Sequence, residues 1–258
     1  MSEQPHLKTM MFCTSFIGEE LHLKRYQRYL KYYIPKMDQL GVDKIVLIDD
    51  GSPLEWLVRL GVPIYDAAKL PKSIEANVCV FRFADNLGRP VLTIIPGWWR
   101  SFSFASVIGA RYNLDKLVHI ESDAYILTDR MLDWIKQTNN EWSSPYTWRY
   151  WYAETAIQII PRKSIPILYQ FWKAGKEFWY KNFLSNIQYI PELILPIQNV
   201  NKTDFKGDRW GEDWWAEDIP DNADYVCNVG AITCASAYCD NSSKKIERFF
   251  QKHNIYIV

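Results

Sequence analysis

Short apolar runs alternate with longer amphipathic segments along the first half of the chain. The apolar runs are typical of buried strands, and the longer segments repeat apolar residues at helical spacing. In chain order we expect strands at residues 10–13, 44–48, 78–83 and 118–120, with helices at 23–37, 54–60 and 97–113 between them. This alternation predicts an α/β fold, with a Rossmann-like, mostly parallel central sheet flanked by helices.

Polar residues follow each predicted strand. In chain order they are Thr14 and Ser15, Asp49 and Asp50, residues 85–89 (Asp-Asn-Leu-Gly-Arg), and Glu121, Ser122 and Asp123. In open α/β sheets the ligand binds in the crevice beyond the carboxyl ends of the strands. We therefore expect the four clusters to face one crevice, although an ordinary turn is the alternative interpretation of each cluster alone.

Glu121 and Asp123 are the candidate metal ligands. In an extended chain, side chains two residues apart point to the same face, so the two carboxylates would project together. Hard oxygen donors of this kind suit Mg²⁺ or Mn²⁺. His253 is a candidate third ligand. The alternatives are a solvated strand end and an ordinary surface histidine.

The second half of the chain is less regular. We expect a strand at residues 154–160, an aromatic amphipathic helix at 164–183 and a loop-rich connection at 191–207. The helix either covers the sheet, lines an acceptor site or rests on a membrane surface. Residues 208–215 then read Asp-Arg-Trp-Gly-Glu-Asp-Trp-Trp, an acidic and aromatic segment. Its structural alternative is an acidic helix N-terminus with a buried pair of tryptophans.

Composition narrows the class of protein. The 258 residues have a formal net charge of zero, which gives no indication of a nucleic-acid partner. The beginning of the chain lacks a signal-peptide pattern, no apolar run approaches the length of a membrane span, and the five cysteines are scattered. We expect a cytoplasmic protein with one domain over residues 1–258. Its 16% aromatic residues, 12 of them Trp, suit either core packing or platforms for sugar rings.

Four segments resemble motifs of glycosyltransferases with the GT-A fold, in particular the inverting, family 2-like enzymes. They are Ile-Asp-Asp-Gly-Ser at residues 48–52, Asn-Leu-Gly-Arg at 86–89, Glu-Ser-Asp at 121–123 and Gly-Glu-Asp-Trp at 211–214. The third segment departs from the family's Asp-x-Asp pattern in its first acid, so Asp123 is the firmer metal ligand. The resemblance covers about the first half of the chain and resumes at residues 211–214.

The resemblance implies a role for each candidate residue. Residues 1–127 would bind a nucleotide-sugar donor, and residues 128–258 a carbohydrate or lipid-linked acceptor, the latter at the inner face of a membrane. The candidate donor contacts are Thr14, Ser15, Asp49, Asp50, Arg89 and Ser122, with Arg89 toward the diphosphate. Asp123 and Glu121, with His253, would hold Mn²⁺ or Mg²⁺. Asp213 would be the general base, Glu212 would bind acceptor hydroxyls, and Trp210 and Trp214 would stack on the acceptor.

Two other functions are compatible with this pattern. A sugar-phosphate nucleotidyltransferase normally has a Gly-rich, basic loop after its first strand, and residues 13–20 (Cys-Thr-Ser-Phe-Ile-Gly-Glu-Glu) are neither. A noncatalytic sugar-binding module on the same fold is the second alternative. A retaining reaction would be the better hypothesis if Glu154 lay nearer the anomeric carbon than Asp213. The sequence does not identify the donor, the acceptor, the linkage or the oligomeric state.

Overall fold

The computed structural model describes residues 8–91, 93–147, 151–182, 191–209, 222–227 and 251. The strands within them are β1 (Thr9–Ser15), β2 (Lys44–Asp49), β3 (Ile64–Asp66), β4 (Val78–Arg82), β5 (Lys116–Ile120), β6 (Tyr125–Ile126), β7 (Ser143–Thr147), β8 (Tyr152–Ala153), β9 (Ile157–Pro161), β10 (Asn199–Asn201), β11 (Gly207–Arg209) and β12 (Tyr225–Cys227). The helices are α1 (Glu20–Tyr33), α2 (Met37–Leu40), α3 (Leu54–Leu57), α4 (Pro96–Arg111), α5 (Asp129–Gln137), α6 (Ile165–Trp179) and α7 (Pro191–Ile194).

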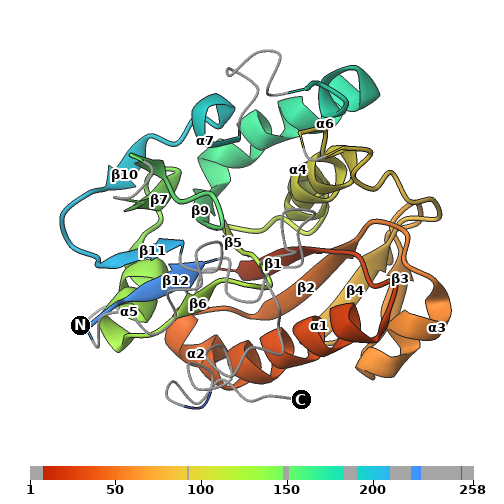
Figure 1. Cartoon of the computed structure of the whole chain (residues 1–258), viewed down its shortest axis with the longest axis horizontal. Coiled ribbons are helices and arrows are strands. Elements are labelled where there is room, and N and C mark those ends of the chain that lie inside the picture. The colour runs from red at the N-terminus through yellow and green to blue at the C-terminus, as the bar shows by residue number, and fades with distance from the viewer. Residues whose placement is uncertain are drawn as a thin grey trace.

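A nine-stranded sheet forms the centre of the fold (Figure 1). Its strand order is β10-β7-β9-β5-β1-β2-β4-β3, and β8 pairs with β7. The pairs among β5, β1, β2, β4 and β3 are all parallel, whereas β9 runs antiparallel to both β5 and β7. Since β9 is antiparallel to both of its neighbours, β5 and β7 run in the same direction. Both strands therefore end at the same edge of the sheet. The α/β prediction with a mostly parallel sheet is confirmed.

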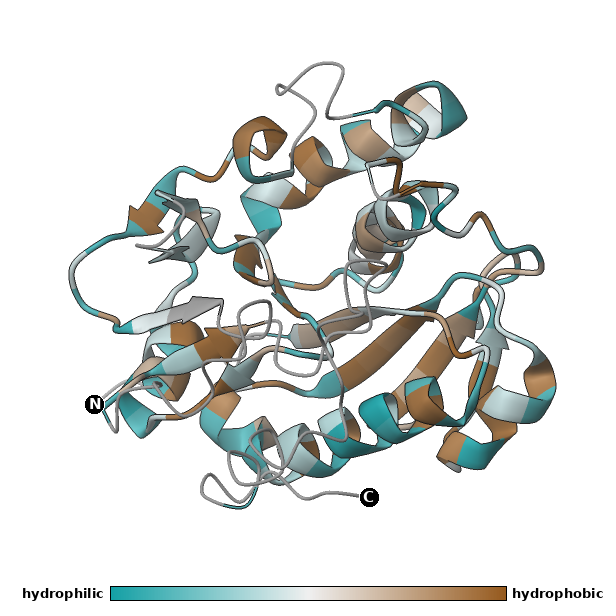
Figure 2. Cartoon of the chain, viewed as in Figure 1, coloured by the Kyte–Doolittle hydropathy of each residue, from teal (hydrophilic) through white to brown (hydrophobic). Residues whose placement is uncertain are grey.

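Helices cover both faces of this sheet, as expected for strands that are apolar on both sides. Helices α1, α2, α3 and α5 pack on the face that carries Met11, Cys13 and Val118. Helices α4 and α6 pack on the opposite face, against Met10, Phe12 and other residues of the intervening parity. In Figure 2 the central strands are accordingly brown, between the helix layers. This arrangement leaves the strand ends as the place where polar groups gather.

Most predicted elements are present, with changes at their ends. The helix expected at residues 23–37 ends at Tyr33, where a short 3-10 turn (Ile34–Lys36) that contains Pro35 follows, and Gly41 then closes α2 at φ 65°. The helix expected at 164–183 breaks at Gly175, which has φ 61° and ψ −154°. Between the predicted helix at 54–60 and the predicted strand at 78–83 lies β3, a short, half-buried edge strand. Among the described residues, no helix is long and apolar enough to cross a membrane.

A smaller sheet of β11, β12 and β6 lies beside the large one. A buried carboxylate joins its segments: Asp224 accepts hydrogen bonds from Arg130 Nε at 2.7 Å, from Thr128 Oγ1 at 2.6 Å and from the backbone N–H of Lys206 at 2.7 Å. Thr128 directly precedes α5, but its hydroxyl bonds Asp224 and does not cap the helix. These bonds connect the residue just before β12 to the start of α5 and to the residue just before β11.

Candidate active site

A pocket of about 410 Å³ lies at the carboxyl ends of β1, β2 and β4. Its wall combines the end of β1, the first turns of α1, the loops after β2 and β4, and the first turns of α4. The lining residues are Thr14, Ser15, Phe16, His22, Arg25, Tyr26, Asp50, Asn86, Gly88, Arg89, Gly97, Trp98 and Ser101. Three of the predicted polar clusters therefore meet at one site, as their positions after parallel strands require.

Asp50 organises two of the loops around this pocket. Its Oδ2 accepts the backbone N–H groups of Leu87 at 3.1 Å and Gly88 at 2.8 Å, and its Oδ1 accepts Arg100 Nε at 3.0 Å. Burial raises the pKa of Asp50, and the N–H of Gly88 and the charge of Arg100 oppose that rise. The carboxylate thus fixes the loop after β4 and has its oxygens occupied by protein donors. Asp50 lines the pocket, but its proposed nucleotide contact stays a prediction.

Arg100 is buried, whereas arginine side chains are mostly exposed. Its guanidinium is buried between Asp50 and Asp85, and it lies 4.1 Å from the centroid of the Phe83 ring. The reason is its position in the first turns of α4, which pack directly on the Asp50 loop. Helix α4 approaches that loop closely because residue 97 is glycine: a Cβ there would lie 2.2 Å from Asp50 Oδ2.

Asp49 is fully buried and forms a turn with Ser52. Its Oδ1 accepts the backbone N–H of Ser52 at 2.8 Å, and its Oδ2 accepts the hydroxyls of Ser52 at 2.6 Å and Ser15 at 3.0 Å. Burial raises the pKa of Asp49. The turn, which was the alternative interpretation of this motif, is therefore present, and Asp49 does not line the described pocket. Its role as a nucleotide contact remains untested.

Glu121, Ser122 and Asp123 lie in a turn and not in an extended strand. Strand β5 ends at Ile120, and the N–H of Ala124 donates to the carbonyl of Glu121 at 3.0 Å. The expectation that alternation aligns the two carboxylates is thus wrong, because alternation applies only within a strand. We call residues 121–124 the acidic turn. Its Ser122 Oγ is buried without a hydrogen-bond partner in the described structure.

The Glu121 carboxylate is surrounded by protein donors. It accepts Trp98 Nε1 at 2.5 Å and Thr14 Oγ1 at 3.1 Å, and His119 Nε2 lies 3.1 Å from its Oε1. Burial alone would raise the pKa of Glu121, but the charge of His119 and the hydrogen bonds from His119 and Trp98 lower it below its ordinary value. His119 itself is buried, with Nδ1 3.2 Å from the carbonyl oxygen of Thr155.

Asp123 makes an ion pair with Arg25 of helix α1, with Oδ2 and Nη2 3.1 Å apart. Burial would by itself lower the pKa of Arg25, but the charge of Asp123 together with smaller contributions from Tyr26, Cys13 and Glu121 raises it above its ordinary value. Arg25 Nε is buried and has no hydrogen-bond partner among the described residues. Arg25 also lines the pocket, so it links the acidic turn to the ligand space. Sequence reasoning missed this residue, because nothing local to α1 indicates its partner.

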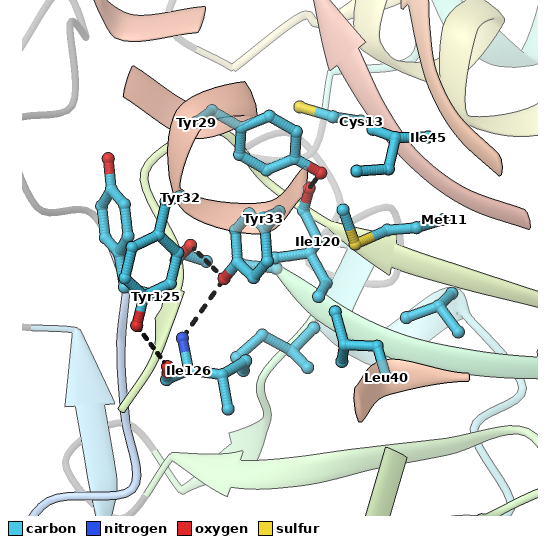
Figure 3. Packing of buried hydrophobic residues seen from close by; sticks show 14 of the residues in the cluster. Met11, Cys13, Tyr29, Tyr32, Tyr33, Leu40, Ile45, Ile120, Tyr125 and Ile126 are labelled. Atoms are coloured by element: carbon cyan, nitrogen blue, oxygen red, sulfur yellow. Dashed lines mark hydrogen bonds between the residues drawn. The ribbon is translucent and has the colours of Figure 1, made fainter. Parts of the chain in front are cut away.

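Tyrosines of α1 hold the acidic turn in place (Figure 3). The hydroxyl of Tyr29 donates to the carbonyl of Ile120 at 3.0 Å, and that of Tyr33 donates to the carbonyl of Ala124 at 2.8 Å. Tyr33 also accepts the N–H of Ile126 at 3.2 Å, and Tyr32 donates to the carbonyl of Ile126. The recurrence of tyrosine along one predicted helix was the available signal for this contact. The helix thereby satisfies backbone groups on both sides of the turn.

The remaining predicted residues divide into two groups. Thr14, Ser15 and Arg89 line the pocket, with Arg89 at its exposed rim. Trp210, Glu212, Asp213, Trp214 and His253 lie outside the described residues. Within the described part of the chain, no three His, Cys, Asp or Glu side chains gather closely enough to hold a metal ion. Both acids of the acidic turn have protein partners, since Glu121 accepts bonds from Trp98 and Thr14 and Asp123 pairs with Arg25.

This arrangement of strands and pocket has known counterparts. The sequence matches no protein-family model and none of the curated proteins with which it was compared. A glycosyltransferase involved in glycosylation of the major capsid of PBCV-1 has a TM-score of 0.51 at 10% identity, over 95% of this chain and 99% of that one. The bifunctional glycosyltransferase WbbM also gives 0.51 at 10% identity, over 98% of this chain and 53% of its own.

These two likenesses show that the chain has the GT-A fold of these glycosyltransferases, which the sequence motifs predicted. The galactosyltransferase LgtC, solved with donor and acceptor sugar analogues, has a lower TM-score of 0.47 at 9% identity, over 97% of this chain and 96% of that one.

Proposed function

We propose that the chain is a glycosyltransferase that moves a sugar from a nucleotide-sugar to a carbohydrate or lipid-linked acceptor. One observation carries this proposal. A cationic pocket lies at the carboxyl ends of the parallel strands, directly beside the acidic turn, on a GT-A fold. Nucleotide ligands of open α/β sheets bind at this edge. Such a site can bind the diphosphate of the donor and stabilise the negative charge that develops on it as its bond to the sugar breaks.

The pocket offers several groups to a diphosphate. Arg25 provides a guanidinium whose Nε has no partner in the described structure, and the Ser101 hydroxyl at the same wall is also buried without one. Arg89 stands at the rim. The first turn of α4 also borders this space through Gly97 and Trp98. These groups favour an anionic ligand over a neutral sugar alone.

A divalent cation fits this site through Asp123. Both acids have protein partners, Arg25 for Asp123 and Trp98 and Thr14 for Glu121, but Asp123 is the acid that matches the Asp-x-Asp pattern of the resembling family. We therefore propose Asp123 as the principal ligand, Glu121 as a weaker one and His253 as a further candidate. Bound Mn²⁺ or Mg²⁺ would supply positive charge to the leaving diphosphate. Arg25 supplies positive charge at the same wall from the protein itself.

Acceptor chemistry requires a base that removes a hydroxyl proton as the new bond forms. We propose Asp213 for this role, with Glu212 on acceptor hydroxyls and Trp210 and Trp214 stacking on the sugar, by resemblance to inverting enzymes. Glu154, the residue that would favour a retaining reaction, is fully buried. It accepts Thr147 Oγ1 at 2.9 Å and the N–H of Ala156 at 3.0 Å, and it does not line the pocket. These contacts favour the inverting mechanism.

Titration calorimetry with UDP, GDP, CMP and dTDP, each with and without Mn²⁺, tests the proposal. We expect one nucleoside diphosphate to bind and Mn²⁺ to strengthen its binding. The matching nucleotide-sugars are then incubated without acceptor, since slow donor hydrolysis separates a transferase from a noncatalytic sugar-binding module. Absence of nucleotide binding under all conditions would refute the proposal. Formation of a nucleotide-sugar from a nucleoside triphosphate and a sugar phosphate would instead establish the nucleotidyltransferase alternative. A cytoplasmic location, at the inner face of a membrane when the acceptor is lipid-linked, remains part of the proposal.

A further inference from the structure

The β7–β8 hairpin carries a tryptophan whose side chain is exposed and whose backbone is in the left-handed region. Trp151 is 79% exposed, more than any other large hydrophobic side chain among the described residues. Its backbone has φ +63°, in the left-handed region, which bulky residues rarely occupy. Exposure of an indole and a left-handed backbone are both unfavourable for the free protein. A residue that combines the two is better explained by a ligand than by folding.

Trp151 is tied to the paired ends of the hairpin. Its N–H donates to the carbonyl of Thr147 at 2.9 Å, and β8 pairs with β7 through Tyr146 with Ala153 and Thr147 with Tyr152. The buried Glu154 carboxylate accepts bonds from Thr147 and from the N–H of Ala156, which links the residues after β8 to the end of β7. These bonds hold Trp151 at the end of the sheet, which reduces the entropy lost when a ligand stacks on its indole.

The hairpin lies on the same edge of the sheet as the acidic turn. Strand β7 is parallel to β5, so Thr147 and Ile120 both end at that edge. The segment after the hairpin contacts the turn directly: the N–H of Glu121 donates to the carbonyl of Ala156 at 2.9 Å. In the strand order β9 separates β7 from β5, so the hairpin lies on the side of the acidic turn away from β1 and the pocket. This position suits a more distant unit of an extended acceptor and not the reacting sugar.

We propose that Trp151 is a stacking platform for a sugar ring of the acceptor glycan, outside the reacting unit. This proposal rests on the proposed function, because it takes the bound glycan to be the acceptor of the sugar transfer. The apolar C–H face of a pyranose packs on an indole, and the remaining hydroxyls stay in water. Trp151 is then a specificity residue that binds the acceptor and takes no part in the chemistry.

The test compares purified wild-type protein with Trp151→Ala, Trp151→Phe, Trp151→Asn and the control Tyr180→Ala, which removes another exposed aromatic ring, 41% exposed, at the end of α6. Each protein is applied to an array of gluco-, galacto-, manno- and N-acetylglucosamine oligosaccharides. The dissociation constant of the best soluble binder is then measured. Donor hydrolysis without acceptor and thermal melting are measured in parallel.

We expect Trp151→Ala and Trp151→Asn to weaken glycan binding about tenfold or more, and Trp151→Phe and Tyr180→Ala to change it less than about threefold. Trp151→Asn should melt no lower than wild type, because asparagine tolerates a positive φ. Donor hydrolysis should be unchanged in every variant. Equal glycan affinity in Trp151→Ala, or no glycan bound by wild type, would overturn the platform. Glycan binding that depends on Trp151 without any donor binding or hydrolysis would refute the transferase proposal alone.

Discussion

Nη2 of Arg25 lies 3.1 Å from Oδ2 of Asp123, and this ion pair joins helix α1 to the acidic turn beside the pocket. The pair brings a cation and the candidate metal ligand to one wall, although the two residues lie far apart in the sequence. A partly buried pair of this kind keeps both groups charged. When a diphosphate enters, Arg25 can bind it through donors that Asp123 does not use, such as the unpartnered Nε.

Replacing Arg25 should weaken binding of nucleoside diphosphates. We expect Arg25→Gln to reduce affinity about tenfold or more, with or without Mn²⁺, because a charge-assisted contact to phosphate is lost. Calorimetry with the nucleotide that binds wild type measures this effect. Arg59→Gln is the matched control, since Arg59 is a surface residue paired with Glu20. Equal losses in both variants would show a general effect of charge and would contradict the role of Arg25.

The two acids of the turn should behave differently. Asp123→Ala should abolish the Mn²⁺-dependent part of nucleotide binding, whereas Glu121→Gln should reduce it by less than about tenfold. Glu121→Gln should lower the free energy of unfolding by about 1–3 kcal/mol, because Trp98, Thr14 and His119 lose a carboxylate partner. Calorimetry and urea unfolding separate these effects, with Asp133→Ala, on the exposed side of α5, as control. The reverse order of metal effects would make Glu121 the principal ligand.

Gly97→Ala should damage both the fold and the pocket. The new Cβ would lie 2.2 Å from Asp50 Oδ2 and 3.0 Å from the carbonyl oxygen of Gly88, so α4 must move away from the loop. We expect a loss of about 1–3 kcal/mol in stability and weaker nucleotide binding. Gly18→Ala is the control for stability, because the atom nearest its Cβ, at 2.9 Å, belongs to the exposed ring of Phe16, a side chain that can move aside. A melting temperature unchanged by Gly97→Ala would show that close packing at this position is not required.

Stability should fall as the pH rises above about 10. Burial raises the pKa of Tyr29, Tyr32 and Tyr33 in the folded chain, so these hydroxyls ionise more readily after unfolding. Above the ordinary tyrosine pKa the unfolded state binds fewer protons than the folded state, which gives a negative slope of stability against pH. Tyr33→Phe should lower stability at neutral pH by about 1–3 kcal/mol and make the alkaline slope shallower. Urea unfolding between pH 7 and 11 measures both.

Tyr169→Phe, at an exposed position of α6, is the control for this series and should keep the wild-type slope. An identical slope in Tyr33→Phe would mean that the buried hydroxyl of Tyr33 does not ionise on unfolding in this range.

Asp213→Asn should separate binding from turnover. If Asp213 takes the proton of the acceptor, the variant keeps its affinity for donor and loses turnover by roughly a hundredfold or more. Donor affinity is measured by calorimetry, and turnover by release of nucleoside diphosphate in the presence of acceptor. Asp133→Asn serves as the control. Unchanged turnover in Asp213→Asn would remove that residue from the mechanism.

The sequence by itself determined the layers of the fold. The apolar run at residues 44–48 and the helical periodicity of 97–113 are local patterns, and burial on a two-faced sheet depends on little else. The rule that strand ends share a crevice also sufficed to bring Thr14, Asp50 and Arg89 to one pocket. Motif resemblance then indicated the GT-A fold, which the structural likenesses confirm.

Tertiary structure alone decided how the polar groups of the site are used. Thr14 and Glu121 are 107 residues apart, and Tyr29 reaches Ile120 across 91 residues, so no local pattern specifies either contact. These partners determine that Glu121 accepts protein hydrogen bonds, that Asp123 pairs with Arg25 and that Arg100 is buried on Asp50. A side chain's preference for water or burial is encoded at its own position. Its partner is set by which distant segments the sheet places side by side.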